Sequence, residues 1–237
     1  MLFSIFFAGL AVASAIPKVS RDESSCFCSG DLVRYNASLE DTYICGDDRL
    51  GPALLPGKLP LFTTLARYDR FNGLTPQQFL EKWTLKEGQW EGGYEYPTHA
   101  GFLLDTQGIP INRTVILPPG TLLDRFGYEG GKYFASVSTP YSQRALPPSS
   151  LNTPKDGSQR FANNYHVYRV VKDLAAVAGP IAPWFGQPGL GTQFYTEQHG
   201  VTDLLQMGFL VKVADEELTS KQEGCGFDRT QGDVRRP

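Results

Sequence analysis

Hydrophobic residues in this chain gather in short runs rather than in long helical stripes. Gly, Pro or Asn lies close to each run on at least one side, a pattern that predicts β-strands. The runs span Arg113 to Leu117, Tyr133 to Val137, His166 to Val171 and Phe209 to Val213. Because helical signals are few after Leu85, the predicted fold class is α+β, with strands dominating.

Two segments carry helical patterns. Thr75 is a typical N-cap and Pro76 a typical first-turn residue, so a short helix is predicted to start there and to end by Gly88. Its large apolar side chains recur at positions i, i+1 and i+4, which places them on one face. A second short helix is predicted from Val201 to Met207.

The chain starts with an apolar run, residues 1–15, that ends in the small-x-small pattern Ala13-Ser14-Ala15. This pattern is typical of a secretory signal peptide, and the run is too short to span a bilayer. Two glycosylation sequons, at Asn36 and Asn112, are useful only on exposed loops of a secreted protein. The protein is therefore predicted to be a secreted, extracellular glycoprotein without a membrane partner.

An even number of cysteines in an exported chain usually forms disulfides, and this chain has four, at Cys26, Cys28, Cys45 and Cys225. Cys26 and Cys28 are poorly placed to pair with each other, so each is expected to pair with a distant cysteine, and the pairing stays open. Zinc is disfavoured, because no histidine has metal-ligand spacing to a cysteine. Residues 16–116 are predicted to form an irregular, disulfide-held N-terminal arm and supporting region, and residues 214–237 a C-terminal tail.

Charge and missing motifs exclude several classes of function. The 22 Lys and Arg residues against 25 Asp and Glu residues give a net charge of −3, which is unsuited to holding a nucleic-acid backbone. The chain lacks the G-x-S-x-G elbow and the H-E-x-x-H metalloprotease motif, and oxidised cysteines would leave no thiol nucleophile. A glycosidase-like carboxylate pair stays open, because such pairs meet only in the fold.

The candidate chemistry lies in residues 117–148, where arginines, aromatics and glycines stand between proline pairs. Arg125 and Arg144 could bind a diphosphate through charge-assisted forks. Phe126 and Tyr133 offer faces on which a heterocycle can stack. This composition favours an anionic, aromatic ligand, although a β-rich segment with surface-paired arginines is an equal alternative from composition alone.

A second glycine-rich stretch, residues 186–194, leads into an apparent strand that starts near Gln193. It matches neither the G-x-G-x-x-G nor the G-K-[ST] phosphate-binding pattern. Its glycines allow the backbone to approach a ligand, and a plain turn explains them equally well.

Three stretches in the same order carry a family resemblance: LLDRFGYEGGKYFASVSTPYSQRALPPSSL, YHVYRV and GPIAPWFGQPGLGTQF. With them the chain resembles the NAD glycohydrolases of the tuberculosis necrotizing toxin (TNT) family, in particular its secreted fungal branch. The resemblance covers roughly residues 117–213 and implies a TNT-like catalytic domain there. Several motifs in one order are more specific than any one alone.

The resemblance implies that NAD or NADP is the substrate, that nicotinamide and ADP-ribose are the products, and that catalysis needs no cofactor. It makes Arg125 of the D-R-[FY]-G motif and Gln193 of the G-x-G-x-Q-[FY] motif the catalytic pair. It also places Phe126, Tyr133 and Arg144 in positions expected to touch the dinucleotide. Nicotinamide leaves readily because its ring nitrogen is cationic, so Gln193 is expected to position groups rather than to move protons.

Several alternatives stay open. An ADP-ribosyltransferase would break the same bond, and a non-catalytic secreted module would bind a nucleotide or glycan without turnover. Asp215 and Glu216 could supply oxygen ligands to a structural calcium ion, an option that the fungal resemblance favours, or form a solvated acidic cluster. The oligomeric state is open, with a homodimer among the outcomes.

Overall fold

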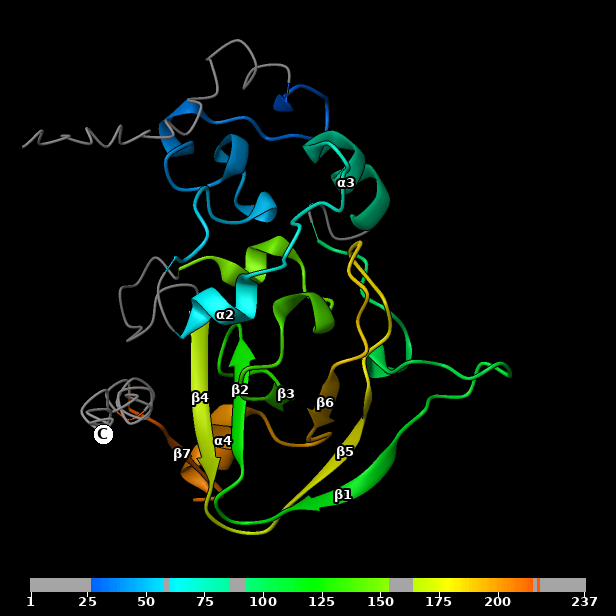
Figure 1. Ribbon diagram of the computed structural model, residues 1–237, viewed down its shortest axis with the longest axis vertical. Helices are drawn as coiled ribbons and strands as arrows, with labels where there is room; N and C mark the ends of the chain where they lie inside the picture. Colours follow the sequence, from blue (N-terminus) through cyan, green and yellow to red (C-terminus); the bar gives the residue numbers. More distant parts are fainter. Residues whose placement is uncertain (1–26, 58–59, 86–92, 154–163, 215–216, 218–237) are drawn as a thin grey trace, which may run out of the picture.

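An antiparallel sheet of seven strands forms the body of the protein in the computed structural model (Figure 1). The structure describes residues 27–57, 60–85, 93–153, 164–214 and 217. The strands follow the spatial order β1-β5-β6-β3-β2-β4-β7. Their bounds are β1 (Arg113–Leu117), β2 (Leu122–Phe126), β3 (Tyr133–Ser136), β4 (Tyr165–Val170), β5 (Leu174–Pro180), β6 (Thr192–Tyr195) and β7 (Leu210–Lys212). The predicted α+β class with dominant strands is confirmed.

The predicted strands are confirmed as β1, β3, β4 and β7, with ends that differ by at most one residue. The hydrophobic pattern missed β2 and β5. Strand β2 places two charged residues, Asp124 and Arg125, at its centre, and β5 is rich in Ala, Gly and Pro, which are depleted in strands. Pairing with neighbours on both sides overrides these weak local preferences.

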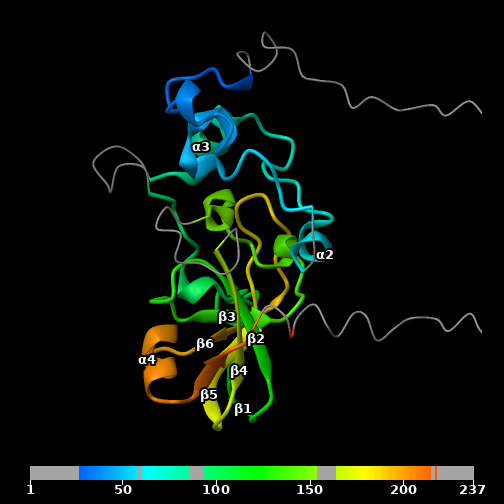
Figure 2. The ribbon, with the colours of Figure 1, turned by 90° about the vertical axis from the view of Figure 1, so that its left-hand side faces the viewer.

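Side chains alternate along β2 and enter two cores on opposite faces of the sheet. Leu123 belongs to the core that helix α4 (Val201–Gln206) covers, and α4 contributes Val201 and Leu204 to it. Phe126 belongs to the opposite core, which includes Leu61 and Leu65 of helix α2 (Leu61–Leu65). Figure 2 shows α4 and α2 on different sides of the sheet. The fold therefore sandwiches the sheet between short helices and loops.

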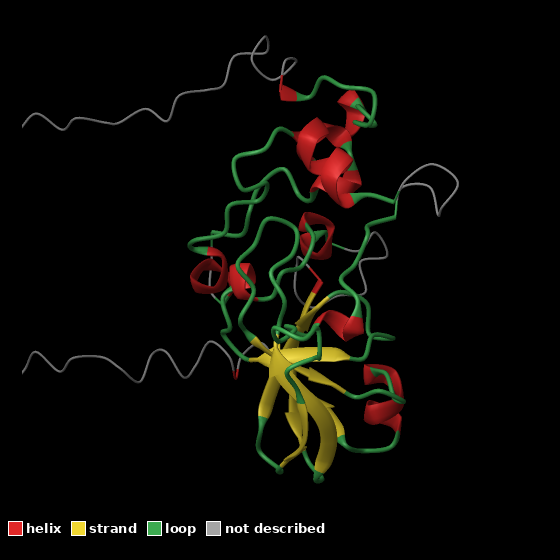
Figure 3. Cartoon of the chain, turned by 90° about the vertical axis from the view of Figure 1, so that its right-hand side faces the viewer, coloured by secondary structure: helices red, strands yellow, loops and turns green. Residues whose placement is uncertain are grey.

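The N-terminal region has a small core of its own, at the end of the molecule away from the sheet (Figure 3). A disulfide joins Cys28 to Cys45, which agrees with the predicted disulfide-held arm. Short 3-10 helices follow at Ala37–Leu39, Ile44–Gly46 and Asp48–Leu50, and three more lie further on, at His99–Gly101, Tyr141–Gln143 and Pro148–Leu151. Phe185, from the loop before β6, packs in this core and ties the arm to the body.

Helix α3 (Pro76–Trp83) forms where the sequence predicts it. Thr75 accepts a hydrogen bond from the backbone nitrogen of Gln78, and the Gln78 side chain accepts one from Thr75, so the two form a capping box. Phe79 and Leu80 are fully buried against the disulfide-held segment. Burial of these two side chains fixes the helix on the arm.

Several predictions fall outside the described residues: the signal peptide at residues 1–15, Cys26, Cys225 and most of the C-terminal tail. Within the described part, no helix has both the length and the apolar character that a membrane crossing requires.

Candidate active site

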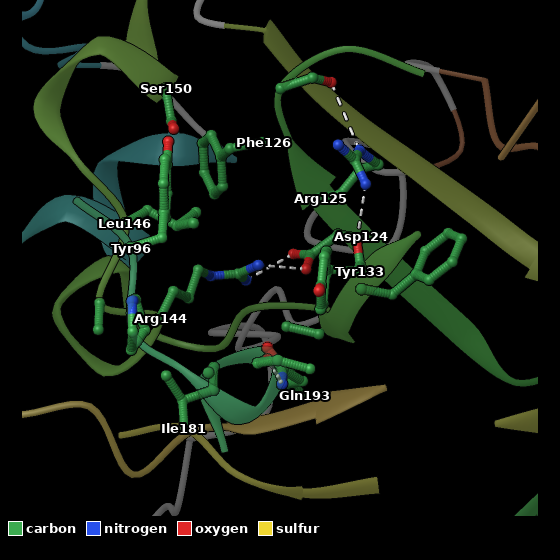
Figure 4. A pocket seen from close by; sticks show the side chains of 17 residues that line it. Tyr96, Asp124, Arg125, Phe126, Tyr133, Arg144, Leu146, Ser150, Ile181 and Gln193 are labelled. Carbon is green, nitrogen blue, oxygen red and sulfur yellow. Dashed lines mark hydrogen bonds and ion pairs between the residues drawn. The ribbon is translucent and has the colours of Figure 1, made fainter. Parts of the chain in front are cut away.

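A cavity of about 480 Å³ opens at the end of strands β2, β3 and β6 (Figure 4). Its wall combines segments that lie far apart in the sequence, namely residues 96–101, 124–135 and 144–150, together with Ile181 from the chain after β5 and Gln193 on β6. All five residues predicted to act on the substrate line it: Arg125, Phe126, Tyr133, Arg144 and Gln193. A pocket of this size suits a small organic ligand.

Strand pairing brings the two predicted motifs together. Asp124 of β2 lies opposite Ala135 of β3, and Ala135 lies opposite Gln193 of β6. Because paired residues share a face, these three side chains form one row across three strands. Strand pairing thus places Gln193 in line with Asp124 of the D-R-F-G segment, although the two residues are far apart in the sequence.

Asp124 and Arg144 form a buried ion pair in the cavity wall. The guanidinium donates from Nη1 to Oδ1 at 2.6 Å and from Nη2 to Oδ2 at 2.8 Å, and Nε donates to the Thr139 carbonyl at 2.9 Å. The Tyr165 hydroxyl also donates to Oδ2 at 2.8 Å. Burial raises the pKa of Asp124, and the Arg144 charge opposes that rise. With Asp124 occupying its fork and cancelling its charge, Arg144 is poorly suited to clamp a diphosphate.

Arg125 lies in the same wall but has a different environment. Nη1 donates to the Tyr133 carbonyl at 2.9 Å, and Nε reaches the Gly127 carbonyl at 3.4 Å. No carboxylate of the described residues lies within salt-bridge distance of it. Burial lowers the pKa of Arg125, because desolvation disfavours the charged form. Glu129 attracts the Arg125 charge from beyond salt-bridge distance. A half-buried cation without a salt bridge among the described residues favours binding of an anion.

Gln193 is only 8% exposed, and its amide has one fixed partner. Nε2 donates to the carbonyl of Ala100 at 2.8 Å, whereas Oε1 has no partner among the described residues. The chain around Ala100 forms a left-handed turn, with φ of 54° at His99, 56° at Ala100 and 78° at Gly101. Backbone in this region is strained for residues other than glycine, and such strain gathers at functional sites. Because the turn fixes the position of the Ala100 carbonyl, which accepts the bond from Nε2, it orients the Gln193 amide.

The two predicted stacking residues differ in exposure. Tyr133 is 42% exposed, and its ring lies parallel to that of Tyr195 with the centroids 4.7 Å apart. Phe126 is buried, with the Arg144 guanidinium 5.1 Å from its ring centre and the Tyr141 ring edge-on to it. Tyr133 therefore offers more free ring surface to a heterocycle than Phe126 does.

Sequence reasoning missed one wall of the cavity. This wall consists of Tyr96, Pro97, Ala100 and Gly101, from the segment before β1. The nearby run of aromatics and glycines was the available signal, but it is equally typical of core packing. Asp124 was also missed as an ion-pair partner, since only the fold shows which arginine it meets.

The predicted calcium ligands Asp215 and Glu216 lie outside the described residues. The neighbouring Glu217 is described and pairs with Arg169. The described residues hold no cluster of three or more His, Cys, Asp or Glu side chains suited to a metal ion.

Comparison with known proteins gives one family. The model of the tuberculosis necrotizing toxin family matches residues 116–213. A curated relative, the conidial surface nicotinamide adenine dinucleotide glycohydrolase nadA of Aspergillus fumigatus, is 48% identical over 183 residues, which are 77% of this chain and 76% of the relative.

Solved structures match more weakly. Tuberculosis necrotizing toxin in complex with its immunity factor is 22% identical, with a TM-score of 0.43, over 76% of this chain and 85% of the toxin chain. Tse6 in complex with Tsi6 is 17% identical, with a TM-score of 0.30, over 44% of this chain and 72% of the matched chain. The identity to nadA over most of both chains decides the assignment: this chain belongs to the tuberculosis necrotizing toxin family, together with the fungal protein nadA.

Proposed function

We propose that the chain is a secreted NAD glycohydrolase. Water adds to the anomeric carbon of the nicotinamide ribose, the bond to the nicotinamide nitrogen breaks, and nicotinamide, ADP-ribose and a proton are released. The supporting observation is one cavity that holds Arg125, a cation without a salt bridge among the described residues, and an oriented amide, Gln193, in a chain 48% identical to a fungal NAD glycohydrolase.

Arg125 is proposed to hold the diphosphate of NAD. Its guanidinium keeps free N–H donors, because two backbone carbonyls take only part of its five. A diphosphate would supply the salt-bridge partner that this half-buried charge lacks among the described residues. Holding the dinucleotide at this end fixes the reacting ribose, so the entropy of orientation is lost on binding rather than in the transition state.

Gln193 is proposed to act at the ribose through its amide oxygen. Since Nε2 is committed to the Ala100 carbonyl, Oε1 is the atom left for the ligand. A carbonyl dipole in a pocket stabilises the positive charge that develops on the ribose as nicotinamide departs, and it can accept a hydrogen bond from the incoming water. A neutral amide takes no proton, so the proton leaves with solvent.

Arg144 is proposed to shape the pocket rather than to neutralise the substrate. Its pairing with Asp124 holds the guanidinium over the Phe126 ring. This arrangement keeps Phe126 in place beside the cavity. Because Asp124 and Thr139 already accept bonds from Arg144, only the remaining N–H groups of Arg144 could donate to the dinucleotide.

The test is nicotinamide release from NAD by the purified protein. Loss of the charge-assisted bond in Arg125→Ala, or of the amide in Gln193→Ala, should lower kcat/KM by about 100-fold or more. Gln187→Ala is the matched control, because Gln187 is equally buried and donates from Nε2 to the Asp69 carbonyl, but does not line the cavity. Product that appears only with an added acceptor would instead identify an ADP-ribosyltransferase, and recovery of intact NAD a binding module.

We also propose that the protein is exported and glycosylated. Both sequon asparagines are exposed in the described structure. Asn36 Oδ1 accepts bonds from Ser38, which leaves Nδ2, the atom that carries a glycan, without a partner among the described residues. Protein secreted by a eukaryotic host should lose mass on treatment with an N-glycosidase, and Asn36→Gln and Asn112→Gln should each remove one glycan.

Two further proposals rest on the sequence. Calcium at Asp215 and Glu216 would be seen as metal bound to protein freed of exogenous ions. A homodimer would be seen in light scattering as twice the mass of the mature chain. The catalytic unit is proposed to include residues 93–101 in addition to 117–213, because that segment contributes a wall and the partner of Gln193.

A further inference from the structure

The guanidinium of Arg125 lies directly against the backbone of Gly131. A Cβ placed on Gly131 would stand 2.2 Å from Nη2, 2.5 Å from Nη1 and 2.6 Å from Cζ of Arg125. Real Cβ atoms do not approach other atoms so closely. All three short contacts are to one guanidinium, which therefore occupies the space that a side chain on Gly131 would take.

Gly131 lies in the turn between β2 and β3, and neighbouring elements hold this turn in place. The first backbone N–H groups of α4 form hydrogen bonds to the turn: Val201 donates to the Gly131 carbonyl at 3.0 Å, and Thr202 donates to the Glu129 carbonyl at 3.1 Å. The Glu129 side chain accepts bonds from Tyr168 at 2.8 Å and from Lys212 at 2.9 Å. The turn is therefore anchored to α4, β4 and β7 and cannot easily move away from Arg125.

We propose that Gly131 is a positioning residue: the missing side chain leaves room in the turn for the Arg125 guanidinium, which can then present its free donors to the diphosphate of the substrate. This inference rests on the proposed function. The φ of Gly131 lies outside the left-handed region, so alanine can adopt its backbone conformation. The obstacle to a side chain there is Arg125 itself, and a Cβ would push the guanidinium off the Tyr133 carbonyl.

The adjacent residue, Gly130, provides a matched control. Its φ also lies outside the left-handed region, and a Cβ there would meet the ring of Tyr128 at 2.3 Å. Tyr128 is 80% exposed and does not line the cavity, so its ring can swing into solvent. Gly130→Ala thus tests the same turn and the same substitution without touching Arg125.

The experiment compares kcat/KM for NAD in full-length wild type, Gly131→Ala and Gly130→Ala. Displacing one charge-assisted hydrogen-bond donor should lower kcat/KM of Gly131→Ala by about 10- to 100-fold. Gly130→Ala should stay within about twofold of wild type, as expected for a surface change. Equal activity of Gly131→Ala and wild type would overturn the proposal, whereas an inactive wild type would overturn the proposed function instead.

A double-mutant cycle separates positioning from folding. In Arg125→Lys the guanidinium atoms that a Cβ at position 131 would meet are absent, so adding Gly131→Ala should change kcat/KM and the melting temperature by little. A loss of activity or of stability from Gly131→Ala that persists in the Arg125→Lys background would overturn the proposal.

A crystal structure of Gly131→Ala gives a readout independent of turnover. The expected result is a guanidinium that has left the Tyr133 carbonyl, on an unchanged turn. An unmoved guanidinium, or a turn detached from α4 around an unmoved Arg125, would contradict the proposed role.

Discussion

The ion pair between Asp124 and Arg144 offers a quantitative test of how the cavity wall is held. Both side chains are almost fully buried, with exposed fractions of 0% for Asp124 and 3% for Arg144. Arg144→Met removes the cation and leaves a buried carboxylate with fewer donors. Removing one partner of a buried pair costs about 3–5 kcal/mol, because the remaining charge is uncompensated. For a chain of this size, that loss lowers the melting temperature by about 6–20 °C.

The pH dependence of the stability loss in Arg144→Met distinguishes its two possible causes, an uncompensated buried charge and lost packing. Burial already raises the pKa of Asp124 above 3.8, and without Arg144 the folded-state pKa rises further. A carboxyl whose pKa is higher in the folded than in the unfolded state destabilises the fold increasingly as the pH rises from the unfolded-state pKa to the folded-state pKa. The loss in Arg144→Met should therefore be largest near pH 7 and shrink as the pH falls toward 3.8. Adding Asp124→Asn, which has no charge to bury, should restore about 1–3 kcal/mol at pH 7.

Urea unfolding of each variant across this pH range makes the measurement. Arg169→Met is the matched control, because Arg169 pairs with Glu217 where both side chains are more than one third exposed, at 34% and 38%. An exposed pair contributes about 0–1 kcal/mol, so this control should unfold almost as the wild type does. An Arg144→Met loss that is independent of pH, or no larger than that of Arg169→Met, would refute the reasoning.

Three smaller predictions concern other parts of the fold. Thr75→Ala removes the N-cap of α3 and should cost about 1 kcal/mol in urea unfolding, whereas Thr75→Ser should cost little. Phe79→Ala empties the N-terminal core and should cost about 3–5 kcal/mol; a loss below 1 kcal/mol would mean that this core does not stabilise the chain. Burial lowers the pKa of His166 below 6.5, against the attraction of Glu129, so the unfolded state binds more protons and stability should fall as the pH drops below about 6.5. In melting curves from pH 7 to pH 5, His166→Gln should lose less stability than the wild type; parallel losses would contradict this assignment.

The sequence predicted which residues would meet, and strand geometry explains why. Gln193 and the D-R-F-G motif are more than sixty residues apart, yet β6 and β2 both pair with β3, which brings Gln193 and Asp124 into register through Ala135. The family motifs indicated that these residues belong to one site, but they did not indicate which strands carry them. The pattern of apolar positions alone could not, because β2 has charged residues where a buried strand usually has apolar ones.

The partners of the predicted residues could not be read from the sequence. The sequence does not distinguish Arg125 from Arg144. Only the fold shows that Asp124 neutralises Arg144, whereas Arg125 has no salt bridge among the described residues. The backbone carbonyl of Ala100, which orients Gln193, has no sequence signature of its own, since every residue carries a carbonyl. What a side chain can do chemically thus depends on contacts that its own motif does not encode.

The contact between Ala100 and Gln193 links the two halves of the chain in one site. Ala100 lies before the region that the family model matches, residues 116–213, whereas Gln193 lies inside it. Without the left-handed turn at Ala100, the Gln193 amide could rotate and present either its oxygen or its nitrogen to the ligand, and a donor facing the ribose would oppose its positive charge. In the proposed function, the segment at residues 96–101 would therefore do more than close the pocket: by binding Nε2 it would leave the Gln193 oxygen to meet the substrate. The function proposed for the family region depends on this upstream turn.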